Sequence, residues 1–207
     1  MLLKEIVEVF QRRAGGGVFD NETRYDISFS EDTIHQARAT IIYRDYQSNK
    51  KINPIWTQQF IGTFSQDLQE SKTFVKFACP PVITLDDFID GFMFVGNLTD
   101  NVSYRKVANR ASLANSNVHR YLSLNVDTPK FIYSDGYIEI YGNAMIKQLK
   151  VDGIFNDPTK IPTFNKEYDQ YPADLKLINS MVDYVFNTEI KNELSEGDKI
   201  KFTKGSK

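Results

Sequence analysis

The sequence predicts an α+β fold, a single domain in which helices at both ends pack on a mostly antiparallel β-sheet. Two patterns indicate it: apolar residues recur at helical spacing near each end, whereas residues 55–151 hold short runs rich in Phe, Ile, Thr and Val. We expect an α+β body over residues 18–196, preceded by a leading helix and glycine joint over 1–17 and followed by a basic tail over 197–207. Both termini are expected to be mobile unless a partner orders them.

The leading helix is expected over residues 2–13. Its apolar residues fall on one side, and Gly15–Gly17 then end the helix and supply a flexible joint. A short helix of this kind has few neighbours in the sequence to pack against. We therefore expect it to dock on the body of the domain or on a neighbouring subunit. The candidate contact residues are Leu3, Ile6 and Phe10.

The second helix is expected to begin at Ser30, whose side chain can cap the first-turn amides. Apolar residues follow at helical spacing to about Tyr46, and Pro54 prevents the helix from resuming. The last helix is expected to start at Pro172 and to run to Leu194, and Gly197 is expected to end it. We expect these two helices to pack together as the rigid part of the domain.

Strands are expected between these helices, at residues 60–64, 73–78, 92–95 and 146–151. The strongest local signal is Asp135-Gly136, a pair that favours a type I′ turn, in the middle of a hairpin over residues 130–141. Alternation along the return strand places Tyr137, Glu139 and Tyr141 on one face, and the isoleucines between them on the other.

Composition argues against several classes of protein. The formal net charge of -2 and a pI near 5.8 argue against a general nucleic-acid binder. A protein of nearly neutral charge that surrounds DNA is compatible with these values. Cys79 is the only cysteine, so no disulfide can form within the chain. The N-terminus lacks the pattern of a signal peptide, and no apolar run is long enough to span a membrane. We expect a protein that is made and used in a cytoplasm, with no membrane partner.

No catalytic, cofactor-binding or metal site is predicted. His35 and His119 are the only histidines, and neither has a partner at metal-ligand spacing. Aspartates at 86, 87 and 90 lack the signature of a calcium loop, so we interpret them as a solvated turn. No glycine-rich phosphate-binding motif is present. A small hydrolase that uses His119 or an acidic pair stays open as an alternative function.

A basic window lies between Asn101 and Val126, where no acidic residue occurs. It contains Arg105, Lys106, Arg110 and Arg120. Two interpretations stay open. In one, Arg105, Lys106 and Arg110 contact DNA phosphates or an acidic neighbouring surface. In the other, the window is an exposed loop whose charge is balanced by acids elsewhere.

The order of motifs in the second half of the chain resembles that of a known family. The hairpin over 130–142 is followed by Ile146-Lys147, by Val151–Pro158 and by Tyr171-Pro172 at the start of an amphipathic helix. In this order and spacing the motifs are similar to those of ring proteins in the head-to-tail connector, or neck, of crAss-like bacteriophages. The first half fits the same layout, so the resemblance covers the chain from about residue 30 to residue 194.

The resemblance implies a structural virion protein with no enzymatic activity and no cofactor. Its copies would form a dodecameric ring under the portal protein, contact neighbouring neck or tail proteins, continue the DNA channel without sequence specificity and dock the tail. Tyr137 and Tyr141 of the tyrosine-rich sheet then join the leading helix as candidate subunit contacts. Assembly would take place in the host cytoplasm. A tail structural subunit with a related fold and a monomeric binding module stay open as alternatives.

Overall fold

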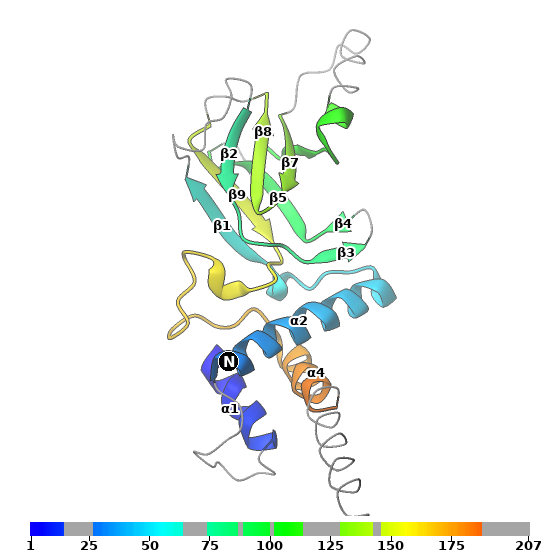
Figure 1. The fold of residues 1–207 in the computed structure, drawn as a ribbon, viewed down its shortest axis with the longest axis vertical. Coiled ribbons are helices and arrows are strands. Elements are labelled where there is room, and N and C mark those ends of the chain that lie inside the picture. Colours follow the sequence, from blue (N-terminus) through cyan, green and yellow to red (C-terminus); the bar gives the residue numbers. More distant parts are fainter. Residues whose placement is uncertain are drawn as a thin grey trace, which may run out of the picture. The chain divides into compact units, whose positions relative to one another are not determined.

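The computed structural model describes residues 1–14, 27–63, 74–86, 89–99, 102–113, 129–142 and 146–187. The chain divides into two compact units, each of which is described by itself (Figure 1). The helical unit consists of Met1–Trp56, Ile83–Ile89 and Asn156–Lys207, and the β unit consists of Thr57–Val82 and Asp90–Phe155. The predicted α+β fold class is confirmed. The expected packing of the helices on a sheet would join the two units, and it stays a prediction.

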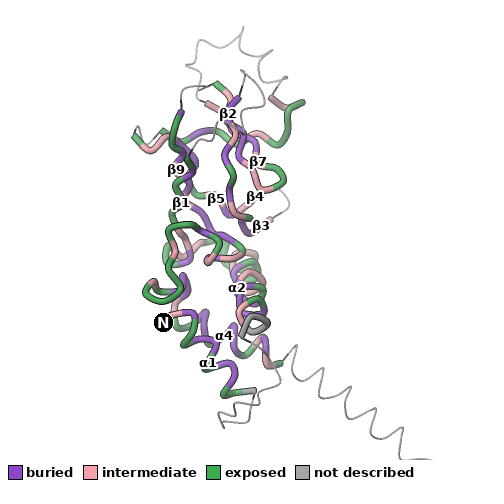
Figure 2. The backbone as a smooth tube through the Cα atoms, turned by 60° about the vertical axis from the view of Figure 1, so that its left-hand side comes forward, coloured by how far each residue is buried: buried purple, intermediate pink, exposed green. Residues whose placement is uncertain are grey.

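The helical unit contains α1 (Leu3–Ala14), α2 (Ile27–Asn49) and α4 (Leu175–Val185). Both α1 and α4 pack against α2, which confirms the expected pairing of the second and last helices. Each helix contributes buried residues at helical spacing, which appear in Figure 2 as repeated buried segments along the three helices. The core of the unit therefore lies between α2 and its two neighbours.

The bounds of α2 differ from the prediction at both ends. The helix begins at Ile27 and not at Ser30, because serine is tolerated inside a first turn and its capping preference does not fix the start. It ends at Asn49, beyond the expected Tyr46. There Lys50 adopts a positive φ of 50°, and its N–H donates to the Tyr46 carbonyl at 2.7 Å. This left-handed residue closes the helix as a glycine commonly does.

The start of α4 also differs from the prediction, because the helix begins at Leu175 and not at Pro172. Its N-cap is Asp174, whose carboxylate accepts a hydrogen bond from the N–H of Leu177 at 2.7 Å. This contact satisfies a first-turn amide, which a proline two residues earlier does not do. The expected continuation to Leu194 lies outside the described residues.

The β unit contains two main sheets, where one was expected. One sheet has the strand order β1-β9-β5, and the other, sheet B, has the order β2-β8-β7-β6. The bounds are β1 (Gln58–Thr63), β2 (Phe74–Ala78), β5 (Phe92–Asn97), β6 (Arg105–Lys106), β7 (Lys130–Ser134), β8 (Tyr137–Tyr141) and β9 (Gln148–Gly153). Pairing within the two sheets is antiparallel except between β6 and β7. A separate short pair is formed by β3 (Thr84–Asp86) and β4 (Ile89–Asp90).

Aromatic residues hold the two sheets together. Phe92 of β5 makes edge-to-face contacts with Phe131 and Tyr133 of β7, at ring-centroid distances of 5.6 and 5.1 Å. On β1, a Cβ added at Gly62 would lie 3.3 Å from the ring of Phe77 on β2, so glycine lets the strand approach that ring. Two sheets form because the apolar faces of these strands cover each other.

The predicted hairpin is confirmed. Its turn residues Asp135 and Gly136 have φ values of 52° and 79°, which a type I′ turn requires. Ile138 and Ile140 are fully buried on one face of β8. The opposite face carries, as predicted, Tyr137, Glu139 and Tyr141.

A buried arginine joins separate segments of the helical unit. Arg38 on α2 has an exposed fraction of 0%. Its Nε donates to the carbonyl of Pro172 at 3.1 Å, and its Nη2 donates to the carbonyl of Trp56 at 2.8 Å. The guanidinium carbon also lies 5.7 Å from the centroid of the Tyr171 ring. Because a buried charge needs such partners, Arg38 holds the 3-10 helix η1 (Pro54–Trp56) and the segment before α4 against α2.

His35, about one turn earlier on α2, extends this network. Its Nδ1 lies 2.8 Å from the Tyr171 hydroxyl, and its Nε2 lies 3.2 Å from Oδ1 of Asp157. Burial lowers the pKa of His35 in spite of the nearby Asp157, so the ring is neutral near pH 7. Nε2–H then donates to Asp157, and Nδ1 accepts the proton of the Tyr171 hydroxyl. Asp157 also caps the 3-10 helix η4 (Pro158–Lys160), because it accepts from the Thr159 N–H at 2.9 Å.

We predict that Arg38→Met lowers the free energy of unfolding by about 2–6 kcal/mol, because two buried carbonyls lose their donor at about 1–3 kcal/mol each. Urea denaturation of the purified chain measures this change. Arg12→Met, at an exposed position of α1, is the matched control and should change the value by less than about 0.5 kcal/mol. Equal effects of the two substitutions would mean that the Arg38 network does not support the helical unit.

We also predict that stability falls as the pH decreases through the range in which histidine titrates. The pKa of folded His35 lies below 6.5, so the unfolded chain takes up a proton more readily and is favoured in acid. Burial opposes ionisation of Asp157, but the Thr159 hydrogen bonds and His35 outweigh it and lower the Asp157 pKa, which adds a loss at still lower pH. Urea midpoints at about pH 7 and about pH 5 should differ less in His35→Gln, whereas His119→Gln should keep the wild-type difference.

Candidate interaction surfaces

The outer face of sheet B carries charged and aromatic side chains. We define this face by Phe74 and Lys76 on β2 and by Tyr137, Glu139 and Tyr141 on β8. The register pairs Phe74 with Tyr141 and Lys76 with Glu139. The rings of Phe74 and Tyr141 lie 5.3 Å apart, and the Lys76 ammonium lies 4.4 Å from the centroid of the Tyr137 ring. The two predicted tyrosines therefore belong to one cluster with cationic and aromatic neighbours.

Glu139 is the electrostatic centre of this face. Its carboxylate is only 5% exposed, and it accepts from Arg110 Nη2 at 2.7 Å and from the Tyr141 hydroxyl at 2.7 Å. Burial opposes its ionisation, yet the hydrogen bonds from Arg110 and Tyr141 outweigh burial and lower the pKa of Glu139. Burial and the hydrogen bond to Glu139 raise the pKa of Tyr141 to about 12. The carboxylate is thus charged and both partners stay protonated at neutral pH.

The described part of the basic window is largely paired with acids of the β unit. Arg110 binds Glu139 and also lies over the ring of Phe74, at 5.3 Å from the centroid. Lys106 on β6 forms an ion pair with Asp90. Arg105, the other β6 residue, has an exposed side chain. Arg120 and His119 lie outside the described residues. Within the described window, Arg105 is therefore the cation most available to an external anion.

The predicted contact residues of α1 have a different environment. Leu3, Ile6 and Phe10 are all buried within the chain, on the side of α1 that packs against the helical core. A contact between these three side chains and a neighbouring subunit would require α1 to leave α2. Their role in assembly stays a prediction. Val9 is an exposed apolar residue of α1.

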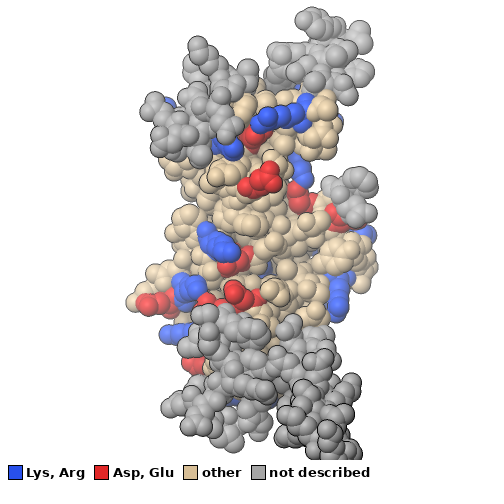
Figure 3. All heavy atoms as spheres, in the orientation of Figure 1, with Lys and Arg blue, Asp and Glu red and all other residues tan. Residues whose placement is uncertain are grey.

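Charges of both signs are interspersed on the surface. Figure 3 shows basic and acidic residues side by side on the face that it draws. Ion pairs within one unit include Lys166 with Glu31 at 2.6 Å and Arg13 with Asp183 at 2.5 Å. Such a surface is typical of a protein whose contacts are not dominated by one sign of charge.

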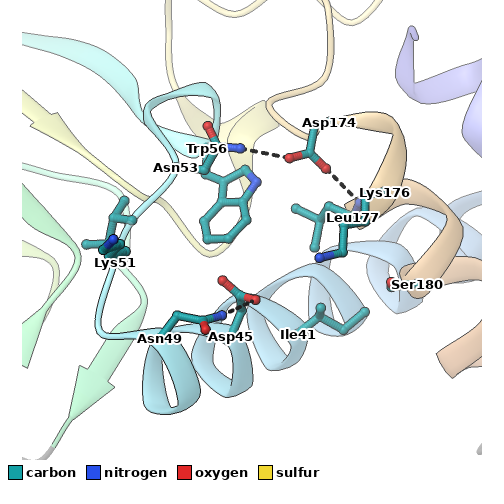
Figure 4. Close-up of a pocket in the computed structure, with 11 residues that line it drawn as sticks. Ile41, Asp45, Asn49, Lys51, Asn53, Trp56, Asp174, Lys176, Leu177 and Ser180 are labelled. Carbon is teal, nitrogen blue, oxygen red and sulfur yellow. Dashed lines mark hydrogen bonds between the residues drawn. The ribbon is translucent and has the colours of Figure 1, made fainter.

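A groove between α2 and the start of α4 was not predicted. It has a volume of about 460 Å³ and lies entirely within the helical unit. Ile41 and Asp45 of α2, Trp56 of η1, and Leu177 and Ser180 of α4 contribute to its lining (Figure 4). The groove brings together segments more than 100 residues apart in the chain.

Two carboxylates of the groove have hydrogen-bond partners within the chain, whereas the indole N–H of Trp56 has none in the described structure. Asp174 accepts from the Asn53 side chain at 2.8 Å as well as from Leu177, and Asp45 accepts from the Asn49 side chain at 3.0 Å. Trp56 is only 6% exposed, yet its indole N–H has no hydrogen-bond acceptor in the described structure. Figure 4 shows the indole nitrogen on the side of α4. An unpaired buried donor is uncommon in folded proteins and needs an explanation.

No group of three or more His, Cys, Asp or Glu side chains in the described ranges could hold a metal ion. No helix in the part of the chain that the structure describes is long and apolar enough to cross a membrane.

Comparison with known proteins identifies a family. No curated protein matches the chain. A family model described as phage tail ring protein 2, of the crAss ring proteins, matches residues 21–199, which cover α2, the β unit and α4. The match agrees with the resemblance inferred from the hairpin and the motifs that follow it. The chain therefore belongs to the crAss phage tail ring protein 2 family.

Proposed function

We propose that this chain is a non-catalytic structural subunit that assembles into a closed ring between the head and the tail of a phage particle. The ring continues the DNA channel below the portal protein and provides a docking surface for the tail. The observation that carries this proposal is the match of residues 21–199 to a family of phage tail ring proteins. The protein is assembled in the host cytoplasm and ends in the virion.

A dodecamer is the copy number that the resemblance to connector rings implies. A closed ring needs a heterologous interface, in which one side of each subunit fits the opposite side of the next. The charged and aromatic outer face of sheet B supports such contacts, because tyrosine, phenylalanine and arginine are enriched at interfaces. We propose Tyr137, Tyr141 and Arg110 as contact residues of this face, where Glu139 fixes the positions of Tyr141 and Arg110.

Passage of DNA without sequence specificity is supported by the balance of charges. A channel that bound phosphates tightly would retard the DNA, and affinity for DNA rises with each phosphate that a cation neutralises. Lys106 and Arg110 are already paired with Asp90 and Glu139. The exposed Arg105 is the residue that we propose for contact with DNA or with an acidic neighbouring ring.

A small enzyme is the second function that a specific observation raises. Asp157, His35 and Tyr171 are arranged as a carboxylate, an imidazole and a hydroxyl in series, as in a catalytic relay. The Tyr171 hydroxyl belongs to a side chain with 2% exposure, and His35 is only 6% exposed. All three residues also join segments of the helical core. These facts favour a structural role for the three residues.

Electron microscopy of the purified full-length chain, alone and mixed with the portal protein of the same phage, tests the proposed function. We predict closed dodecameric rings, formed by the chain alone or on the portal, because a heterologous interface closes at a fixed copy number. A monodisperse monomer that ignores the portal would contradict the proposal and would favour a monomeric binding module.

Charge reversal at Arg105 tests the proposed contact of β6. Arg105→Glu should weaken salt-dependent binding of the ring to DNA or to the portal by up to about fivefold per subunit, the range of an exposed charge contact. Lys147→Glu, at another exposed position of the β unit, is the matched control and should leave binding unchanged. Filter binding and co-sedimentation over a series of salt concentrations measure both variants. Equal behaviour of the two variants would assign Arg105 to the solvated surface.

A further inference from the structure

The Trp56 groove has open hydrogen-bonding capacity that points to a specific kind of occupant. Its floor presents a buried indole N–H without an acceptor, beside the apolar side chains of Ile41 and Leu177. The lining carboxylates of Asp45 and Asp174 already accept hydrogen bonds within the unit. The buried donor of the groove that has no partner is the Trp56 indole N–H. A fitting occupant has an apolar body that ends in an acceptor.

Two lysines extend this preference to the rim. Lys51 and Lys176 both line the groove and are exposed, and within the described residues neither forms an ion pair or hydrogen bond. These two cations offer partners for an acidic group beside the apolar part of an occupant, although Asp45 and Asp174 also belong to the lining. The volume of about 460 Å³ accommodates one large side chain with its flanking backbone.

The helical unit itself presents a group with these properties. Tyr168, in the segment between η4 and α4, is 78% exposed and is the most exposed large apolar side chain of the described chain. Glu167 and Asp169 flank it in the sequence. A tyrosine that projects into solvent between two carboxylates combines an aromatic body, a hydroxyl acceptor and negative charge.

The segment that presents Tyr168 is held in shape by its own hydrogen bonds. The N–H of Asp169 donates to the Asn165 carbonyl at 2.8 Å, and the Asn165 N–H donates to Asp169 Oδ2 at 2.7 Å. The Asn165 side-chain oxygen accepts from the Glu167 N–H at 2.9 Å. Because the backbone is already ordered, an aromatic anchor on it loses little conformational entropy on binding.

Tyr168 and the groove lie at different ends of α2. Lys166 binds Glu31 near the N-terminal end of the helix, at 2.6 Å. The α2 residues that line the groove run from Ile41 to Asn49, which places them about 15–27 Å further along the helix axis at a rise of about 1.5 Å per residue. Figure 1 agrees, since the segment between η4 and α4 extends to the left while α2 runs to the right. Among the described residues of one chain, Tyr168 is exposed and the groove is open.

We propose that the groove receives Tyr168 of a second copy of this chain, and that this contact repeats from subunit to subunit around the ring. The phenol oxygen accepts from the Trp56 indole N–H, and Glu167 and Asp169 face Lys51 and Lys176. The contact is heterologous, since an end of one helical unit enters the opposite end of the next, which is the geometry that closes a ring. This inference rests on the proposed function and names the subunit interface that it needs.

Substitution of the two aromatic residues tests the proposal in the full-length chain. Tyr168→Ala should raise the dissociation constant for self-association by roughly 30-fold, the effect of truncating a central aromatic anchor. Tyr43→Ala, at an exposed tyrosine of α2 outside the groove lining, is the matched control and should leave it unchanged. Sedimentation velocity over a concentration series measures both. Tyr168→Phe and Trp56→Phe each remove one end of the proposed hydrogen bond. The increase in the free energy of self-association in the double variant should therefore be smaller than the sum of the two single increases.

Cross-linking then identifies the occupant of the groove. A Tyr168→Cys chain mixed with a Ser180→Cys chain should form a disulfide-linked heterodimer under mild oxidation. The native Cys79 does not interfere, because burial raises the pKa of its thiol to about 12. No cross-link, together with wild-type association of Tyr168→Ala, would overturn the inference. A cross-link from Ser180→Cys to the portal protein, but not to Tyr168→Cys, would also overturn it, because a different protein would then fill the groove.

The outcomes for the ring and for the groove can be told apart. If wild-type rings form and Tyr168→Ala rings form equally well, the proposed function stands and the groove contact is wrong. If the wild-type chain neither self-associates nor assembles on the portal, both proposals fail. Thermal unfolding of each variant at a concentration where the chain is monomeric checks the fold, and Tyr168→Ala should keep the wild-type midpoint because the side chain is exposed.

Discussion

The burial of one guanidinium determines how the helical unit is built. Arg38 spans from α2 to the carbonyls of Trp56 and Pro172, which are far apart in the sequence. A guanidinium removed from water needs acceptors for its N–H groups. The segments that contain Trp56 and Pro172 therefore both have to lie against α2 at fixed positions. The groove follows from this requirement, because the same two attachments place Trp56 and the cap of α4 beside the second half of α2.

Both units satisfy their charges internally, in the same way. Glu139 holds Arg110 and Tyr141 in the β unit, and Asp157 holds His35 and the start of η4 in the helical unit. Removal of Arg110 would leave the buried Glu139 carboxylate without one of its donors, which is costly.

Local features of the structure were predictable from the sequence, and features that depend on distant residues were not. Asp135-Gly136 and the alternation around Ile138 and Ile140 are decided within a few residues, so the hairpin and its outer face were predicted correctly. The burial of Arg38 was not predictable, because an arginine between apolar positions of a helix resembles one on a solvated face. The groove was missed for the same reason, since Asn53 and Asp174 meet only in the folded chain. The fit of Lys106 and Arg110 to acids on other strands likewise depends on strand order.

The helical unit is discontinuous in the sequence, and this has a consequence for synthesis. The first part of the unit ends at Trp56, whereas the segment that completes it begins only at Asn156. During translation α2 therefore emerges long before Tyr171, Pro172 and α4, and contacts of such large sequence separation form late. Neither the groove nor the segment that bears Tyr168 exists on a chain that stops early. If the proposed contact closes the ring, a polypeptide that stops before α4 lacks the complete groove and cannot form that contact with both of its neighbours.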